Sequence, residues 1–286
     1  MDKSGFSLKD ANIALIGLGL MGGSLALSLK GRCRRLSALD SHQPTLELAL
    51  RQEIVHVADS DPAKALADAD LVILACPVPA IVGWLQRLPD YVQHPCIVLD
   101  IGSSKRTIVA ALETLPTNFD PIGGHPICGR EQLSLANAER FLYHDAPFVL
   151  TALSRTSEQA RTAALQIVEA LGANLVWLDA DEHDRILAAT SHLPYLLSSA
   201  LAHATAGDAA PLVGPGFRSS TRLAGTPSSM MLGVLQSNRD NVLDALERLQ
   251  EQIAILKSAL SVGDYDSLQK TLDSARLHYR ELVTEN

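Results

Sequence analysis

Short apolar runs and amphipathic stretches alternate through the first half of the chain. Four apolar runs are typical of buried strands, and Gly, Pro or Asp comes within two residues of the end of each: Ile13–Ile16, Leu36–Leu39, Leu71–Ala75 and Ile97–Leu99. Helical patterns lie between them, for example at Ser24–Leu29 and Pro62–Ala67. Because strands alternate with helices, we expect a parallel sheet with right-handed crossovers.

Two later runs extend this sheet in the prediction, at Phe148–Thr151 and Asn174–Leu178. Between them, Ser157–Leu171 has a helical pattern that Gly172 ends. The pattern changes after about Asp181, where strand-like runs stop. We therefore predict an α/β domain with a mostly parallel sheet over residues 1–180. An all-helical domain follows over residues 181–286.

The helical half is predicted to begin with a helix that runs from Glu182 into the 200s and is interrupted near Pro194. A stretch rich in Gly, Pro and Ser follows at 207–229. Beyond it, apolar residues recur at spacings of four and three: Val242, Leu246, Leu249, Ile253, Leu256 and Leu260. This spacing places them on one helix face. The face either packs within the chain or forms the interface of a homodimer, and Asp264–Val283 repeats the pattern less regularly.

Composition narrows the class of protein. The formal net charge is -8, which argues against a nucleic-acid partner and against attraction to anionic membranes. The polar N-terminus has no signal-peptide core and no apolar run is long enough to cross a bilayer, so we expect a cytoplasmic protein without a membrane partner. The four cysteines lack the spacing of a zinc site, so no metal is expected.

A glycine turn is the strongest local motif. Gly17, Gly19 and Gly22 form a GxGxxG pattern that follows an apolar strand and opens a helix. Gly17 permits the tight turn, Gly19 lets the backbone approach a pyrophosphate, and Gly22 lets the helix pack closely. The helix start, with Leu20 and Met21, supplies free N–H groups to a bound phosphate.

Asp40 ends the second predicted strand, where a carboxylate can accept hydrogen bonds from ribose hydroxyls and repel a 2′-phosphate. The sequence therefore predicts an α/β Rossmann-type dinucleotide-binding domain over residues 1–180 and favours NAD as the cofactor. Arg34 and Arg35 are close in sequence but precede the strand, so NADP is not excluded.

Three further strand ends face the same cleft: Cys76-Pro77, Asp100–Lys105 and Gly123–Pro126. The second combines a carboxylate, two hydroxyls and an ammonium, and its alternative interpretation is a helix start capped by Ser103 or Ser104. His125 follows two glycines at a strand end, where an imidazole suits proton transfer near neutral pH, although a lone histidine is more often structural.

The helical half contributes further polar residues: His183, His192, Tyr195, Arg218 and Arg222. The two arginines are four positions apart, and arginine is suited to bidentate capture of a carboxylate. The alternative is that they are solvated surface residues or pair with an acid on the same helix.

Together these motifs resemble the prephenate/arogenate dehydrogenase family of tyrosine biosynthesis. The matching segments are GLGLMGGS at 17–24, DIGSSK at 100–105, GGHPICGRE at 123–131, EHDRILAATSHLPY at 182–195 and GFRSSTR at 216–222. The resemblance implies oxidative decarboxylation of a small-molecule substrate, prephenate or arogenate, with hydride transfer to NAD(P). It also implies that the all-helical domain over residues 181–286 is a substrate-binding and dimerisation domain.

The resemblance also implies roles for individual residues. His125 looks like the catalytic histidine that deprotonates the C4 hydroxyl, and Ser103 looks like the serine that orients it. Arg222 looks like the arginine that binds a substrate carboxylate, Glu131 matches an acid near the mouth of the site, and His192 matches a histidine of the helical wall.

Two positions depart from the family pattern. Arg130 stands where many relatives have a small hydroxyl residue, and Tyr195 where many have a second histidine. Both are expected near the substrate side chain, so the choice between prephenate and arogenate stays open. The rivals are another two-domain hydroxyacid or imine oxidoreductase, and a dinucleotide sensor without turnover.

Overall fold

The computed structural model describes residues 5–129 and 133–284. The chain forms two compact units, of which the first ends at Asn238 and the second begins at Arg239. The first unit contains the sheet and all the strand ends singled out by the sequence, and the second contains two long helices.

An eight-stranded sheet forms the centre of the first unit, in the order β3-β2-β1-β4-β5-β6-β7-β8. Its strands are β1 (Asn12–Ile16), β2 (Arg35–Leu39), β3 (Val57–Asp59), β4 (Leu71–Leu74), β5 (Cys96–Asp100), β6 (Phe119–Pro126), β7 (Pro147–Ala152) and β8 (Asn174–Trp177). The first six strands are parallel, β7 is antiparallel to β6, and β8 is parallel to β7. The order of the first six is that of a Rossmann fold, as predicted. The sequence analysis did not predict β3.

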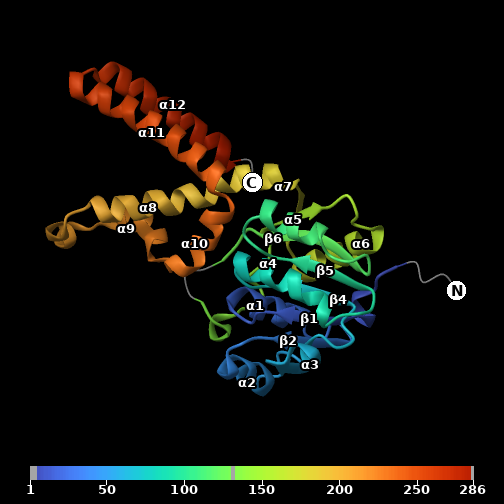
Figure 1. The fold of residues 1–286 in the computed structure, drawn as a ribbon. Coiled ribbons are helices and arrows are strands. Elements are labelled where there is room, and N and C mark those ends of the chain that lie inside the picture. The colour runs from blue at the N-terminus through green and yellow to red at the C-terminus, as the bar shows by residue number, and fades with distance from the viewer. Residues whose placement is uncertain (1–4, 130–132, 285–286) are drawn as a thin grey trace. The chain divides into compact units, whose positions relative to one another are not determined.

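Helices cover both faces of the sheet (Figure 1). They are α1 (Leu20–Leu29), α2 (Gln43–Arg51), α3 (Pro62–Ala65), α4 (Val78–Arg87), α5 (Arg106–Glu113) and α6 (Glu158–Leu171). Side chains of β1 alternate between the faces: Leu15 belongs to the core with α1 and α6, whereas Ile16 belongs to the core with α4 and α5. This two-sided burial explains why the strands are continuous apolar runs.

The predicted helix after β7 is confirmed, together with both of its ends. Ser157 caps α6 by accepting hydrogen bonds from the amides of Gln159 and Ala160. Gly172 ends the helix in the left-handed region, at φ 66°.

The helical part of the first unit contains α7 (Ala180–Leu187), α8 (Leu193–Ala204), α9 (Pro215–Thr221) and α10 (Ser228–Ser237). A π-helical segment, Ala188–His192, joins α7 to α8. Pro194 has no N–H to donate into the preceding turn, so the interruption predicted there is confirmed.

Polar and apolar contacts join these helices to the Rossmann part. The hydroxyl groups of Ser104 and Ser237 are 2.7 Å apart, and a Cβ on Gly233 would lie 2.7 Å from the Cδ of Pro79 in α4. Helices α7 to α10 therefore belong to one compact unit with the sheet. The domain boundary at 180/181 stays a prediction from the sequence.

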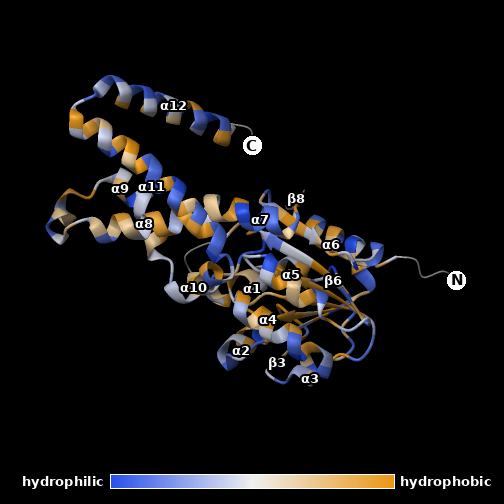
Figure 2. Cartoon of the chain, turned by 45° about the horizontal axis from the view of Figure 1, so that its top comes forward, coloured by the Kyte–Doolittle hydropathy of each residue, from blue (hydrophilic) through white to orange (hydrophobic). Residues whose placement is uncertain are grey.

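The second unit consists of α11 (Arg239–Val262) and α12 (Tyr265–Thr284), which pack on each other. Both predicted helices are therefore confirmed. Figure 2 shows hydrophobic segments among hydrophilic ones along both helices. Of the predicted apolar face, Ile253 and Leu260 are exposed. No helix in the described part of the chain is long and apolar enough to cross a membrane.

Candidate active site

The candidate site lies at one edge of the sheet. Strands β1, β4, β5 and β6 are parallel neighbours, so their carboxyl ends meet at this edge (Figure 1). The glycine turn follows β1, Cys76 follows β4, Ser103 follows β5, and His125 lies near the end of β6. These predicted residues from four separate segments therefore share one edge of the fold.

The glycine turn fits a dinucleotide. Gly17 has φ +101°, and a Cβ there would lie 2.6 Å from the carbonyl oxygen of Ala75. A Cβ on Gly22 would lie 2.0 Å from the carbonyl oxygen of Gly17, so the start of the helix must be this close to the strand. A Cβ on Gly19 would meet no atom within 4 Å. The turn is closed around its first and third glycines and open at the second, where a pyrophosphate would approach.

The start of α1 faces the same open side. Gly19 is the N-cap, makes no side-chain cap and is followed by Leu20 and Met21 in the first turn. Next to the turn, Asp40 accepts hydrogen bonds from the amides of Leu18 (2.8 Å) and His42 (2.9 Å). The Asp40 carboxylate is therefore fixed beside the turn, as ribose binding requires.

Cys76 and Pro77 lie between the carboxyl end of β4 and the start of α4. Pro77 is exposed and is the N-cap of α4, and Cys76 is half-buried. Burial, followed by the negative charges of Asp100 and Asp40, raises the pKa of the Cys76 thiol to about 12. The thiol is therefore neutral and can serve as a contact surface but not as a nucleophile.

The N-cap interpretation of Ser103 and Ser104 is wrong. Helix α5 begins at Arg106 with Lys105 as its N-cap, and the Lys105 side chain makes no capping hydrogen bond. The amides of Lys105 and Arg106 instead donate to the carboxylate of Asp184, at 2.7 and 3.0 Å. Asp184 of α7 thus caps the start of α5 in place of a serine from the same turn. Ser103 is half-buried in the turn between β5 and α5.

Lys105 and Asp100 fix the ends of β5 and β6 to each other. Both side chains are fully buried and form an ion pair. Lys105 also donates to the carbonyl oxygen of Gly124 at 2.6 Å, and Asp100 accepts from the amide of Gly124 at 3.3 Å. Burial raises the pKa of Asp100 and lowers that of Lys105, while their mutual attraction opposes both shifts. The residue after Gly124 is His125, which is therefore held by a rigid backbone.

His125 is the first of three hydrogen-bonded residues. Its Nδ1 lies 2.8 Å from Nε2 of His183, and Nδ1 of His183 lies 2.8 Å from Oδ1 of Asp184. His183 and Asp184 are fully buried, whereas His125 is half-buried. Burial, followed by the charges of His183, Lys105 and His192, lowers the pKa of His125 well below its ordinary value. The imidazole is therefore neutral at neutral pH and can accept a proton.

His192 is connected to Asp184 through the side chain of Asn238. Its Nδ1 is 3.2 Å from Nδ2 of Asn238, which donates to the carbonyl oxygen of Asp184 at 2.6 Å. Burial lowers the pKa of His192 to about 4, with Asp184 opposing the shift. The structure thus assigns His192 a buried contact that links the π-helical segment to α7 and α10.

The remaining predicted substrate residues are on other helices. Tyr195 is half-buried in the first turn of α8. Arg218 is exposed on α9 and donates to the carbonyl oxygen of Val213 at 3.4 Å, and the exposed Arg222 begins a 3-10 turn that packs against α8. Both arginines therefore lie on the helical part and not on the sheet edge. Arg130 and Glu131 lie outside the described residues.

The partners of His125 were not predicted from the sequence. His183 was expected only as one polar residue of the helical half, and neither Asp184 nor Asn238 was expected at the site. The adjacent His-Asp pair at the start of a helix was the available signal, because such a pair can orient a base. Within the described residues, no group of three His, Cys, Asp or Glu side chains is arranged to hold a metal ion.

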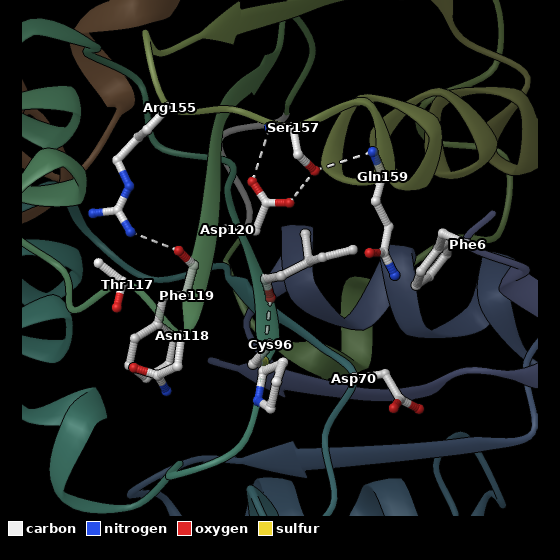
Figure 3. Close-up of a pocket in the computed structure, with 12 residues that line it drawn as sticks. Phe6, Asp70, Cys96, Thr117, Asn118, Phe119, Asp120, Arg155, Ser157 and Gln159 are labelled. Atoms are coloured by element: carbon white, nitrogen blue, oxygen red, sulfur yellow. Dashed lines mark hydrogen bonds between the residues drawn. The ribbon is translucent and has the colours of Figure 1, made fainter. Parts of the chain in front are cut away.

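A pocket of about 540 Å³ opens at the opposite edge of the sheet, at the amino ends of β5 and β6 (Figure 3). Three of its polar side chains, those of Asp120, Arg155 and Ser157, have partners within the protein. Arg155 donates to the carbonyl oxygens of Pro116 (2.9 Å) and Phe119 (2.7 Å), and Ser157 donates to the carboxylate of Asp120. These groups join the strands to α6, so we do not assign this pocket as the active site.

Family models match both parts of the chain. The model described as prephenate dehydrogenase, nucleotide-binding domain, matches residues 25–177, and the model described as prephenate dehydrogenase, dimerization domain, matches residues 179–274. The chain belongs to the prephenate dehydrogenase family. This membership decides against the hydroxyacid and imine oxidoreductases that the sequence left as rivals.

Individual members of this family are similar to the protein over nearly its whole length. A prephenate dehydrogenase from Bacillus subtilis is 29% identical over 284 residues, which are 96% of this chain and 76% of the relative. The crystal structure of prephenate dehydrogenase from A. aeolicus with hydroxyphenyl propionate and NAD+ has a TM-score of 0.88 at 25% identity, covering 97% of this chain and 100% of that one. Synechocystis arogenate dehydrogenase has a TM-score of 0.81 at 28% identity, covering 95% and 100%.

Proposed function

We propose that this protein is an NAD-dependent prephenate dehydrogenase, which converts prephenate to 4-hydroxyphenylpyruvate and CO2. The observation on which this rests most is a neutral His125 on the same sheet edge as an open glycine turn. Its Nδ1 is engaged by His183, so Nε2 is the nitrogen left to accept a proton. Family membership supplies the substrate class.

In this proposal His125 acts first as a base and then as an acid. Its Nε2 takes the proton of the C4 hydroxyl as the carbon–oxygen double bond forms. NAD+, held by the glycine turn and Asp40, would supply the hydride acceptor for the same carbon. The bond between the ring and its carboxylate breaks, CO2 leaves, and the electron pair enters the ring, which becomes aromatic. His125 then returns its proton to the phenolate oxygen, so no proton is consumed overall. Ser103, three residues past the end of β5, is the proposed partner of the hydroxyl.

NAD is the preferred cofactor in this proposal. Asp40 follows the carboxyl end of β2, whereas Arg34 and Arg35 are at its amino end. Five strand residues separate the two ends by about 16 Å. Arg34 is also engaged, since it donates to Asn12 at 2.9 Å. Neither arginine is therefore suited to bind a 2′-phosphate beside Asp40.

The substrate carboxylate is assigned to Arg222, with Arg218 as the alternative. Glu131, Arg130 and Tyr195 are the proposed contacts of the substrate side chain. Arogenate is the second candidate substrate, because a solved relative at 28% identity is named arogenate dehydrogenase. The two substrates differ in whether the side chain has a keto group or an amine.

A homodimer through the C-terminal helices completes the proposal. The family model over residues 179–274 is described as a dimerization domain. Exposed apolar side chains of α11 and α12 support such an interface, among them Ile253, Leu260, Leu272 and Leu277. Light scattering on the purified protein tests the assignment, and a monomeric mass at micromolar concentration contradicts it.

Turnover of prephenate and arogenate, each with NAD and NADP, tests the function. We expect the highest kcat/KM for prephenate with NAD, and an absence of activity in all four combinations overturns the proposal. His125→Asn should lower kcat by about two to four orders of magnitude with NAD affinity retained. His203→Asn, which changes an exposed histidine of α8, is the matched control.

A further inference from the structure

Asp184 connects the start of α5 to the imidazole of His183. Its Oδ1 accepts from Nδ1 of His183 and from the amide of Lys105, and its Oδ2 accepts from the amide of Arg106. Burial alone raises the pKa of Asp184, but the hydrogen bonds from His183, Arg106 and Lys105 oppose it, and the pKa lies below the ordinary value. Asp184 is therefore an ionised carboxylate that can only accept hydrogen bonds.

This acceptor determines the direction of the two hydrogen bonds that follow. Because Asp184 only accepts, the proton between it and His183 belongs to Nδ1 of His183. With its proton on Nδ1, the His183 ring presents the lone pair of Nε2, and this nitrogen accepts from Nδ1 of His125. His125 is consequently protonated on Nδ1, and its Nε2 has a lone pair.

We propose that His183 and Asp184 are positioning residues that hold His125 in the tautomer whose Nε2 can accept the substrate proton. This inference rests on the function proposed for His125. Neither residue touches substrate in this account. They act through His125, as the acid of a Ser-His-Asp triad acts through its histidine.

The anchoring of Asp184 explains why the arrangement is rigid. Two backbone amides of α5 fix its carboxylate, and the side chain of Asn238 fixes its carbonyl oxygen. A rotation of the His183 ring would break the bond to Asp184 in a fully buried site, where a lost partner is costly. The tautomer of His125 is thus set by the backbone amides at the start of α5, by Asp184 on α7 and by Asn238, which follows α10.

The first test is spectroscopic and needs no substrate. In protein with 15N-labelled histidine, we expect His125 as the Nδ1–H tautomer near pH 7, with resonances assigned from His125→Asn and His183→Gln. The titratable groups that face His125 are His183, Lys105 and His192, with Asp184 behind His183. A His125 found as the Nε2–H tautomer overturns the inference even if the protein turns over prephenate.

The second test is kinetic and uses paired variants. His183→Leu leaves the Nδ1–H of His125 without an acceptor and should lower kcat about a hundredfold or more, while NAD affinity is retained. His183→Gln places an amide oxygen near the position of Nε2 and should recover most of that loss. Equal kcat values for wild type, His183→Leu and His183→Gln contradict the inference.

Asp184→Asn gives a third, independent result. The amide cannot accept from every donor that surrounds it, so we expect a mixture of His125 tautomers and a kcat at least about tenfold lower. Asp181→Asn is the matched control, because it makes the same change on α7 at a side chain that is 88% exposed. If Asp184→Asn does not fold, the tautomer of the wild-type protein still decides the question.

The outcomes separate the two proposals. A wild-type protein with the expected tautomer but no turnover of prephenate or arogenate rejects the proposed function and not the hydrogen-bond direction. Turnover that is insensitive to His183 rejects the positioning role and not the function.

Discussion

The ammonium group of Lys105 is paired with the carboxylate of Asp100, and neither side chain is exposed to solvent. The same ammonium holds the carbonyl of Gly124, one residue before His125. The pair therefore supports both the junction of β5 with β6 and the position of the proposed base. Removing one partner leaves the other as an uncompensated buried charge.

Lys105→Met should lower the free energy of unfolding by about 3–5 kcal/mol, measured by urea denaturation. The double variant Asp100→Asn/Lys105→Met should recover part of the loss, because no charge is then left without a partner. Lys64→Met is the control, since the Lys64–Asp59 pair is on the surface, and we expect little change there. Equal losses in the buried and surface variants would contradict the role given to the pair.

Alanine at the second and third glycines of the turn should have opposite consequences. Gly19→Ala places its methyl group in open space, so folding should be normal while NAD binding weakens about tenfold or more. Gly22→Ala places its methyl group 2.0 Å from the carbonyl oxygen of Gly17, so thermal stability should fall as well. Melting temperatures and NAD titrations separate the two effects. Unaltered NAD affinity in Gly19→Ala refutes the assignment of the pyrophosphate site.

Arg222→Gln should raise KM for prephenate about ten- to hundredfold, because a charged hydrogen bond to a carboxylate is lost. The change should affect KM for NAD little. Arg218→Gln, four positions earlier, provides the comparison under the same assay. If the effect follows Arg218 instead, the carboxylate is held there.

Acid should destabilise the protein through its buried histidines. The pKa of His192 is about 4 in the folded protein against 6.5 ordinarily, and that of His125 is also lowered. The unfolded chain thus binds protons more readily, so stability is fully present above pH 6.5 and is lost as pH falls through 4. His192 alone accounts for about 3 kcal/mol of this loss.

Urea denaturation at pH 7, 5.5 and 4 measures the effect. His192→Asn keeps an acceptor for Asn238 but cannot titrate, so the decrease between these pH values should be smaller. His203→Asn, on the exposed surface, should retain the full decrease. An identical pH dependence in all three proteins would exclude His192 as its source.

Much of the fold followed from periodicity. Buried on both faces, β1, β2, β4 and β5 are mainly apolar runs, and Gly, Pro or Asp lies at or within three residues of the end of each. Ser157 and Gly172 mark the ends of α6 by local backbone chemistry. The short β3 has only half-buried residues and so leaves no apolar run to detect. Only the end of β6 was predicted, at Gly123–Pro126, because Pro121, Gly123 and Gly124 disfavour a strand by propensity.

The site was predictable where a residue follows a strand. Gly17, Asp40 and His125 were found because parallel strands end at one edge. His183 lies 58 positions from His125, and Asp184 reaches the amide of Lys105 across 79 positions, so their contacts depend on how α7 packs against α5. That packing is a tertiary property, and local spacing does not encode it.

The π-helical segment before Pro194 also sets a direction in space. One extra residue in a helix turns everything beyond it by about 100°, since an α-helix has about 3.6 residues per turn. Deleting one residue of Ala188–His192 would restore a regular helix and turn α8, together with Tyr195, by about 100° relative to α7. The direction in which the side chains of α8 point therefore depends on a single inserted residue in the π-helical turn.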